Sequence, residues 1–219
     1  MPPKTAIFGK GGLIGSHLFD YYQSFYPDLL GTDRTAFDLR NPQLSFSLEG
    51  YKWAIIAAGF ATPQRCLSNP DLVEAIDVRG MRTVVHALQK RDVTPILFST
   101  AYVYDGKEEC YYPDTPTTPL NAYGQLHADR EKELGGCLFL RLGRVYGEDE
   151  RSIIGSIAAQ LIRGEVVRAA VDQELQLVHV EDVVSNAITF CITRGKRNSP
   201  PLPEGGVSSY ELVFILQSV

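Results

Sequence analysis

The chain has 219 residues, 44% of them hydrophobic and 21% charged, which is typical of a single soluble domain with a full core. Its net charge of −5, without a basic run, argues against a surface for nucleic acid or an anionic membrane. No apolar run is long enough to cross a bilayer, and the first expected strand leaves no room for a signal peptide, so we expect a cytoplasmic protein.

The first two predicted elements are a strand over 5–9 and a helix over about 13–25, with glycines in the turn between them. Gly9 would permit a tight turn, Gly12 would let backbone N–H groups approach a pyrophosphate, and Gly15 would let the helix pack on the strand. Glycines at this place predict a dinucleotide site. Its expected contacts with the cofactor are Gly9, Lys10, Gly11, Gly12, Leu13, Ile14 and Gly15.

A short apolar run over 29–31 predicts the second strand, and two charged residues follow it. Asp33 lies where an acid can accept hydrogen bonds from an adenosine ribose. Arg34 comes next and could instead bind a 2′-phosphate. The pair leaves both NAD and NADP open as the cofactor.

The rest of the chain alternates strand-like and helical patterns. Further strands are predicted over 53–58, 95–99, 137–142 and 175–180, and further helices over 70–91, 120–134, 151–164 and 181–194. This alternation predicts an α/β fold with a doubly wound parallel sheet and helices on both faces. We expect a dinucleotide-binding domain over 1–195, followed by a linker and a last helix within 196–219.

The cysteines are scattered along the chain without a CxxC pair, at positions Cys66, Cys110, Cys137 and Cys191. This spacing predicts buried, reduced thiols and not a disulfide framework. It also gives no ligand set for a metal ion, so we expect no metal site.

Motifs from about residue 4 to 217 occur in the order found in one family. They are the glycine turn at 9–15, Asp38-Leu39, Ala57-Ala58-Gly59, the helix segment 77–80, the strand end 98–104, the segment 119–124, the strand end 140–147 and the segment 178–183. With these motifs the chain resembles the extended short-chain dehydrogenase/reductase family, above all its sugar-nucleotide branch around dTDP-4-dehydrorhamnose reductase. The resemblance implies a Rossmann-like fold and an NAD- or NADP-dependent reaction on a nucleotide-activated sugar.

The resemblance also implies roles for residues beyond the glycine turn. Thr100 would hydrogen-bond the reacting sugar oxygen, and Tyr123 would exchange a proton with that oxygen as hydride moves. His127 stands where the family has a lysine that lowers the pKa of the tyrosine and holds the nicotinamide ribose. The further cofactor contacts that the resemblance implies are Asp38, Leu39, Ala57, Ala58, Gly59, Ser99, Tyr123 and His127.

Some residues depart from the family pattern. His127 is expected to be mostly neutral at pH 7 and to gain its charge near pH 6.5, so it would lower the pKa of Tyr123 less than a lysine. The dehydratases of the family carry an Asp-Glu pair where this chain has Ala101-Tyr102, so we do not expect a dehydratase. The reductase branch usually has Asp at position 101, and Ala101 departs from that pattern too. Asp77 stands where asparagine is usual.

The family's chains also continue beyond the last matching motif for several dozen residues. Those residues build the lobe that holds the nucleotide-sugar. The resemblance therefore implies a short, vestigial C-terminal lobe for this sequence, with most of the usual base and pyrophosphate contacts missing.

Charged residues near the end of the chain allow both a structural and a binding role. His179 is expected to be a packed, hydrogen-bonded residue, and Asp182 to cap or brace the helix over 181–194. Three arginines are candidate anion contacts, although arginines at such places more often have a surface or structural role. They are Arg141, Arg144 and Arg151.

Two functions stay open. One is an NAD(P)-dependent oxidoreductase or epimerase acting on a nucleotide-activated sugar, with Thr100, Tyr123 and His127 as catalytic residues. The other is a non-catalytic cofactor-binding or regulatory subunit, such as the regulatory partners of methionine adenosyltransferase in the same branch. Either protein could act as a homodimer or with a partner subunit.

Overall fold

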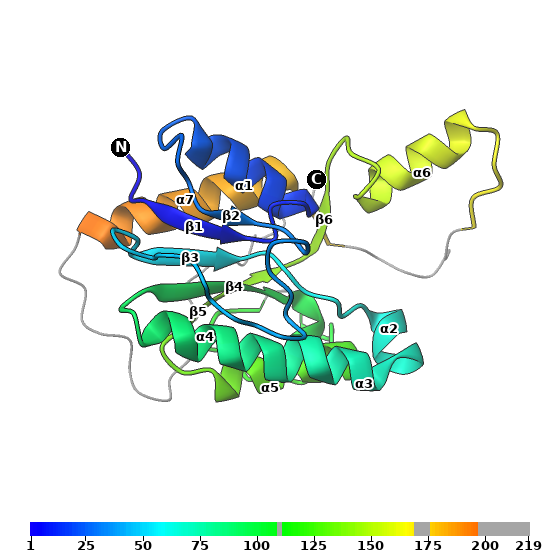
Figure 1. Ribbon diagram of the computed structural model, residues 1–219. Coiled ribbons are helices and arrows are strands. Elements are labelled where there is room, and N and C mark those ends of the chain that lie inside the picture. Colours follow the sequence, from blue (N-terminus) through cyan, green and yellow to red (C-terminus); the bar gives the residue numbers. More distant parts are fainter. Residues whose placement is uncertain (109–110, 169–175, 197–219) are drawn as a thin grey trace.

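The computed structural model describes residues 1–108, 111–168 and 176–196, and its centre is a five-stranded parallel sheet with the order β2-β1-β3-β4-β5 (Figure 1). The strands of this sheet are β1 (Thr5–Phe8), β2 (Gly31–Thr32), β3 (Trp53–Ile56), β4 (Thr94–Thr100) and β5 (Leu138–Leu142). The helices around it are α1 (Leu13–Gln23), α4 (Met81–Gln89), α5 (Ala122–Glu133) and α7 (Val180–Lys196). Because α1 and α7 cover one face and α4 and α5 the other, the predicted doubly wound α/β fold is confirmed.

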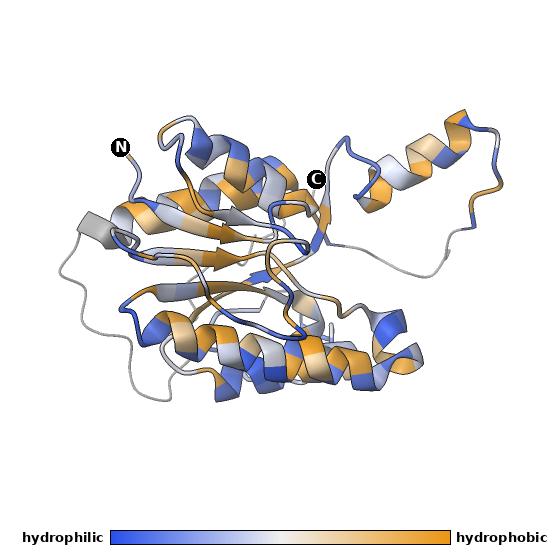
Figure 2. Cartoon of the chain, viewed as in Figure 1, coloured by the Kyte–Doolittle hydropathy of each residue, from blue (hydrophilic) through white to orange (hydrophobic). Residues whose placement is uncertain are grey.

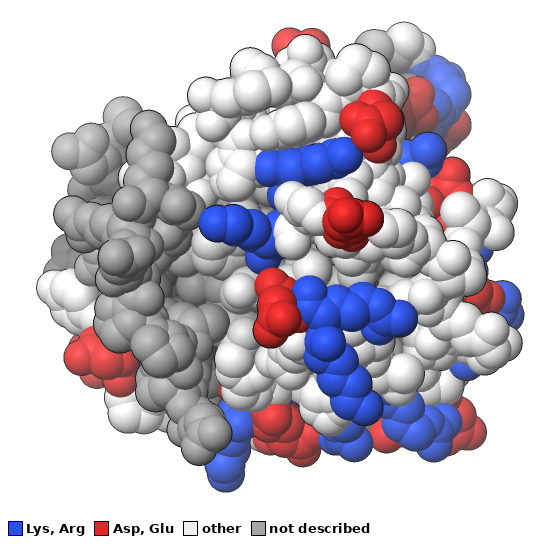
Figure 3. All heavy atoms as spheres, turned by 60° about the vertical axis from the view of Figure 1, so that its left-hand side comes forward, with Lys and Arg blue, Asp and Glu red and all other residues white. Residues whose placement is uncertain are grey.

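The strands are apolar along almost their whole length because helices cover both faces of the sheet. Ala6, Ile7, Ile55, Ile96 and Leu97 are completely inaccessible to solvent. Figure 2 shows the hydrophobic residues concentrated in the strands and along the helices beside them. On the face drawn in Figure 3, Lys and Arg side chains are interspersed with Asp and Glu.

The parallel register brings the predicted site loops to one edge of the sheet. Phe8 at the end of β1 pairs with Ile56 at the end of β3, and Ile56 pairs with Leu97 in β4. The glycine turn, the segment 57–59 and Thr100 therefore leave the sheet side by side at its carboxyl edge. In open α/β sheets this edge is where ligands bind.

Three short elements were not predicted. They are α2 (Pro63–Ser68), the strand β6 (Arg144–Tyr146) and the 3₁₀ turn η2 (Ala101–Val103). Each is too short for a hydrophobic period to show in the sequence. The predicted strand over 175–180 forms as β7 (Leu177–His179), but it pairs with β6 in a separate two-stranded sheet.

The helix predicted over 70–91 is interrupted by a wider turn. It forms as α3 (Pro70–Val73), a π-helical segment η1 (Glu74–Gly80) and α4. A Cβ on Gly80 would lie 2.0 Å from the carbonyl oxygen of Leu39, so a glycine is needed where this helix crosses the loop after β2. Segments of π-helix often occur at functional sites.

The helix α6 (Ile153–Ile162) extends away from the sheet (Figure 1) and carries exposed apolar side chains, among them Leu161 and Ile162. In the described residues, no helix is both long and apolar enough to cross a membrane. The linker and last helix predicted within 196–219 lie outside the described residues, apart from the end of α7 at Lys196.

Candidate functional site

Two glycines of the first turn are fixed by close backbone packing. Gly9 has a φ of +94°, and a Cβ there would lie 2.8 Å from the backbone of Ala57 and Ala58. A Cβ on Gly15 would lie 2.1 Å from the carbonyl oxygen of Gly9. The turn is further held where the Gly9 and Lys10 amides donate to the carbonyl oxygen of Thr32, at 2.7 and 2.9 Å. The turn after β1 is therefore a rigid part of the fold.

Gly12 has a different environment. A Cβ on it would meet only ordinary contacts, at 3.5 Å from the Gly9 oxygen and 3.7 Å from the Ala57 oxygen. Gly12 caps α1 without any side-chain hydrogen bond, and the first turn of the helix contains no acidic residue. The first amides of α1 are thus open to an anion, and the helix dipole favours one there. The residues of this turn fit the pyrophosphate of a dinucleotide.

Replacing Gly12 with alanine is expected to weaken NAD(P) binding at least tenfold without unfolding the protein, because the added methyl group fits the fold but occupies the space beside the helix amides. Calorimetric titration with each cofactor measures the effect. Gly15→Ala is the matched control, and it should instead lower the free energy of unfolding by about 1–3 kcal/mol because its methyl group overlaps backbone. Unchanged cofactor affinity in folded Gly12→Ala would contradict the predicted pyrophosphate position.

The adenosine end of the predicted site lies in the loop after β2. Asp33 accepts hydrogen bonds through Oδ1 from Thr35 and Ala36, and these bonds lower the pKa of its carboxyl group. Asp38 is bound by Arg40, with Nε 2.8 Å from Oδ2, and this pairing lowers the pKa of Asp38 to about 2. Since Asp38 already has this partner, an adenine contact through its carboxylate would compete with Arg40.

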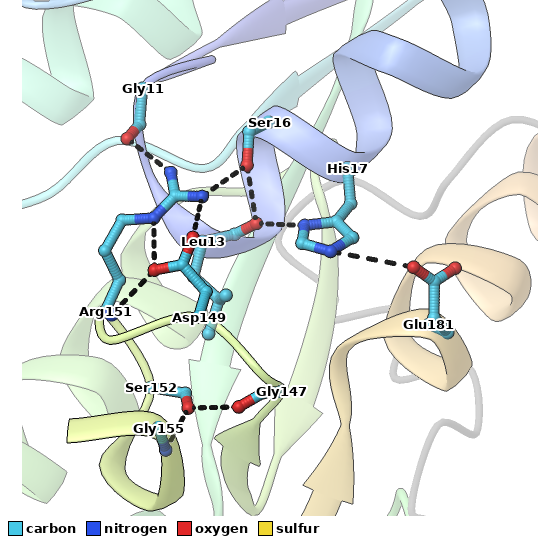
Figure 4. A network of polar contacts seen from close by, with 10 residues as sticks. All are labelled: Gly11, Leu13, Ser16, His17, Gly147, Asp149, Arg151, Ser152, Gly155 and Glu181. Carbon is cyan, nitrogen blue, oxygen red and sulfur yellow. Dashed lines mark hydrogen bonds and ion pairs between the residues drawn. The ribbon is translucent and has the colours of Figure 1, made fainter. Parts of the chain in front are cut away.

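The segment that contains Asp149 and Arg151 contacts the glycine turn (Figure 4). The Arg151 guanidinium donates to the carbonyl oxygen of Gly11 at 2.8 Å and to Ser16 at 3.1 Å, and it pairs with Asp149. The sequence made Arg151 a candidate anion contact, but its guanidinium N–H groups bind Gly11, Ser16 and Asp149. On the far side of α1, His17 lies 3.6 Å from Glu181 of α7.

Thr100 and Tyr123 are brought together by the packing of α5 on the loop after β4. Thr100 ends β4, and its hydroxyl accepts a hydrogen bond from the Tyr102 amide at 3.3 Å. Asn121 caps α5 by accepting from the Gly124 amide at 2.8 Å. A Cβ on Gly124 would lie 2.0 Å from the Tyr102 oxygen, so the first turn of α5 rests directly on this loop.

Tyr123 and His127 lie one helical turn apart on the same face of α5. Their rings meet edge to face, with centroids 4.7 Å apart. Burial raises the pKa of Tyr123, while the Arg130 charge and the Thr100 hydroxyl act to lower it. Tyr123 is therefore a protonated phenol at neutral pH.

Burial lowers the pKa of His127 to about 3, and the positive charge of Arg130 adds to this effect. The expectation that His127 gains a charge near pH 6.5 is wrong, because the residue is only 7% exposed and the charge of Arg130 also disfavours the imidazolium. A neutral imidazole at this position supplies no fixed charge to Tyr123.

Two buried charged residues beside this pair were missed or underrated in the sequence. Asp77 of η1 accepts hydrogen bonds from the amides of Phe60 and Ala61, at 2.9–3.1 Å, and burial raises its pKa. Arg130 of α5 is buried, and its Nε has no hydrogen-bond partner among the described residues. The available signal for Arg130 was its spacing of seven from Tyr123, which places both on one helix face.

Ser99 and Arg141 belong to a buried network under the site. The Ser99 hydroxyl donates to Glu131, and Arg141 pairs with the same carboxylate with Nη2 2.6 Å from Oε2. Arg141 also donates to the Tyr104 hydroxyl and to the carbonyl oxygen of Pro113. These two predicted contacts thus turn their side chains toward Glu131.

The remaining candidates from the sequence lie apart from Tyr123 and His127. The His179 ring packs on Tyr146 with centroids 5.1 Å apart, as expected for a packed residue, and its Nδ1 accepts from the Glu181 amide at 3.3 Å. Arg144 is exposed in β6, and Asp182 lies in the first turn of α7.

The thiols and metal ligands give no further site within the described ranges. The structure has free thiols at Cys66, Cys137 and Cys191, while Cys110 lies outside the described residues. No three His, Cys, Asp or Glu side chains in those ranges are grouped as a metal ion would need.

One curated relative is the probable low-salt glycan biosynthesis reductase of Haloferax volcanii, which is 29% identical over 133 residues. The match covers 55% of this chain, and it spans only 44% of the length of that relative.

Two solved structures have the same fold. The dTDP-4-dehydrorhamnose reductase of Bacillus anthracis, in complex with NADP, superposes with a TM-score of 0.73 at 21% identity, covering 87% of this chain and 71% of that one. The protein MoeE5, in complex with UDP-glucose and NAD, gives a TM-score of 0.74 at 21% identity, with coverages of 89% and 73%.

The family model of the RmlD substrate binding domain matches residues 4–204, which is most of the chain. The match extends from the glycine turn, through Thr100 and Tyr123, to beyond α7. The chain therefore belongs to the RmlD substrate binding domain family, in the sugar-nucleotide branch of the extended short-chain dehydrogenases/reductases.

Proposed function

We propose that the protein reduces a keto group of a nucleotide-activated sugar with NADPH or NADH. The observation that carries the proposal is the pairing of Thr100 with a half-buried, protonated Tyr123 at the edge of the sheet where the glycine turn also lies. A neutral phenol is an acid, and an acid is what a carbonyl oxygen needs as hydride reaches its carbon. The family is one of NAD(P)-dependent nucleotide-sugar reductases and epimerases.

The chain's own residues have separable tasks in this reaction. The glycine turn and the first amides of α1 would hold the pyrophosphate, and Asp33 or Arg34 would bind the adenosine half. The cofactor, when bound, supplies the hydride. Thr100 would donate a hydrogen bond to the substrate carbonyl oxygen, and Tyr123 would give that oxygen its phenolic proton. The product is then an alcohol, and Tyr123 regains its proton from solvent.

Reduction fits the site better than epimerisation does. An epimerase must first oxidise its substrate, and for that step Tyr123 has to act as a base. Burial raises the pKa of Tyr123 and so disfavours its phenolate form. The same site therefore favours the acid role at neutral pH.

A non-catalytic, cofactor-binding role is the second candidate. The observation in its favour is the buried, neutral His127 in place of the family's lysine. Such a protein would keep the glycine turn and bind the cofactor, but it would transfer no hydride.

The test has two parts. Mass spectrometry of the native protein identifies any co-purified NAD(P), and absorbance at 340 nm follows turnover with a panel of dTDP-, UDP- and GDP-4-ketosugars. Oxidation of the reduced cofactor with at least one ketosugar is the expected result. Confirmed cofactor binding without turnover on any member of the panel would reject the reductase in favour of the non-catalytic role.

Arg34 is expected to set the preference for NADP. Its side chain is exposed beside Asp33 and makes no ion pair within the described ranges. Loss of one charge-assisted hydrogen bond costs about 1.5–3 kcal/mol, so Arg34→Ala should weaken NADP binding roughly tenfold or more and leave NAD binding unchanged. Arg40→Ala is the control, since Arg40 is bound to Asp38 and its loss should affect both cofactors alike. Equal losses for NAD and NADP in Arg34→Ala would contradict this role.

A further inference from the structure

We propose that Arg130 is the positioning residue that supplies a fixed positive charge to Tyr123 from two turns along α5. The proposal rests on the proposed function, because it gives Tyr123 the cation that His127 does not provide. It concerns a residue that no motif of the chain includes.

The helix geometry directs Arg130 toward the site. Positions 123, 127 and 130 are spaced by four and three residues, so they form one stripe along α5. Side chains on a helix lean toward its N-terminus, which here is the end that carries Tyr123. We therefore expect the long Arg130 side chain to run back along the stripe, and its charge affects both His127 and Tyr123.

Arg130 is buried, and no carboxylate among the described residues forms an ion pair with it. It is only 7% exposed, and no described residue accepts a hydrogen bond from its Nε. A buried guanidinium that had only a structural role would ordinarily be paired through its fork of donors, as Arg141 is with Glu131. The field of Arg130 is therefore not cancelled by a close ion pair and extends to its neighbours.

The groups facing Arg130 come from η1, from α5 and from the segment before β5. Asp77 of η1 has the largest effect on Arg130, followed by Tyr123 and Glu131 of α5 and by Cys137. His127 of α5 also faces its charge, while Cys66 of α2 faces Asp77 and Tyr123. The carboxylate of Asp77 is held by the Phe60 and Ala61 amides, and the carboxylate of Glu131 by Arg141 and Ser99. Both carboxylates thus have their hydrogen bonds elsewhere.

This arrangement gives opposite signs for two substitutions. Burial raises the pKa of Tyr123, the charge of Arg130 lowers it, and the charge of Asp77 raises it. Removing the cation should therefore make Tyr123 a weaker acid, and removing the carboxylate should make it a stronger one. A purely structural role for Arg130 predicts no such opposition.

The experiment measures the phenol itself. The protein is prepared with fluorotyrosine in place of tyrosine, so that ¹⁹F NMR reports each phenol, and the signal of Tyr123 is assigned by its loss in Tyr123→Phe. Arg130→Gln should raise the pKa of Tyr123 by about 1–2 units, the effect of one charge about 6–12 Å away at an effective dielectric constant near 20. Asp77→Asn should lower it, and Arg130→Lys should keep it close to that of the unmodified chain.

Arg82→Gln is the matched control, because Arg82 pairs with Glu133 on the exposed side of α4 and α5 and should leave the Tyr123 titration unchanged. No upward shift in Arg130→Gln would overturn the proposal. If Arg130→Gln does not fold, an unchanged titration in Asp77→Asn together with a shifted one in Arg130→Lys would overturn it.

The titration needs no turnover, so it separates the two proposals. A shift in a protein that reduces no ketosugar would leave the charge assignment in place and reject the reductase. Turnover of a ketosugar, together with a Tyr123 titration that does not depend on Arg130, would support the reductase and reject the charge assignment. In an active protein, Arg130→Gln should also move the limb of the kcat/KM profile that reports Tyr123 to higher pH by the same amount.

Discussion

Replacing Tyr123 with phenylalanine is expected to lower turnover of the ketosugar by about 10²–10⁴-fold, the usual contribution of a positioned general acid. The change removes one hydroxyl group and keeps the ring, so the edge-to-face contact with His127 is preserved. The free energy of unfolding should change little, and cofactor affinity should fall far less than the rate. Absorbance at 340 nm gives the rate, and calorimetry gives the affinity for NAD(P).

The pH dependence supplies a second check on Tyr123. Because burial raises the pKa of its phenol, reduction should be independent of Tyr123 ionisation around neutrality and should fall only at alkaline pH. The reverse oxidation should rise about tenfold per pH unit below that pKa, since it needs the phenolate. Tyr21→Phe, at a half-buried position of α1 outside the candidate site, controls for loss of a hydroxyl group and should retain full activity. Turnover that survives Tyr123→Phe within a factor of ten would remove Tyr123 from the chemistry.

Replacing Arg141 with alanine is expected to lower the free energy of unfolding by about 3–5 kcal/mol, the usual result of removing one partner of a buried ion pair. Arg141 and Glu131 are almost fully buried, with side-chain exposures of 10% and 2%. The truncation would leave the Glu131 carboxylate with Ser99 alone in an apolar interior, where an unpaired charge is costly. Urea unfolding followed by circular dichroism measures the loss.

Arg82→Ala serves as the control for this prediction. Arg82 and Glu133 form an ion pair on the surface, with exposures of 44% and 51%, and such pairs contribute about 0–1 kcal/mol. A loss in Arg141→Ala no greater than that in Arg82→Ala would show that the buried network does not hold α5 against β4 and β5.

Much of the fold and part of the site were predictable because their signals are local. The glycine turn lies between a strand and a helix that are adjacent in sequence, and the close contact of Gly15 with Gly9 explains why glycine recurs at this spacing. Thr100 and Tyr123 each end or begin an element with a recognisable pattern. Their pairing follows from the parallel order of the strands.

The rest could not be predicted because it depends on contacts between distant segments. The charge of Asp77 in η1 affects the pKa of Arg130 in α5, but in the sequence each is only a charged residue within a helical pattern. The pKa of His127 depends on burial, which the sequence shows only indirectly, so its ordinary value of about 6.5 was the natural expectation. Strand β6 is short and forms only because residues 177–179 return to pair with it.

The contact of Arg151 with the glycine turn makes two parts of the chain thermodynamically interdependent. Gly11 and Ser16 lie where the pyrophosphate is expected, while Asp149 and Arg151 precede α6. If the cofactor strengthens or loosens the Arg151 contact, then the order of the segment before α6 must change the cofactor affinity by the same factor, because coupling free energies are reciprocal. A ligand bound near α6 would in that case change the affinity for the cofactor without contacting the cofactor.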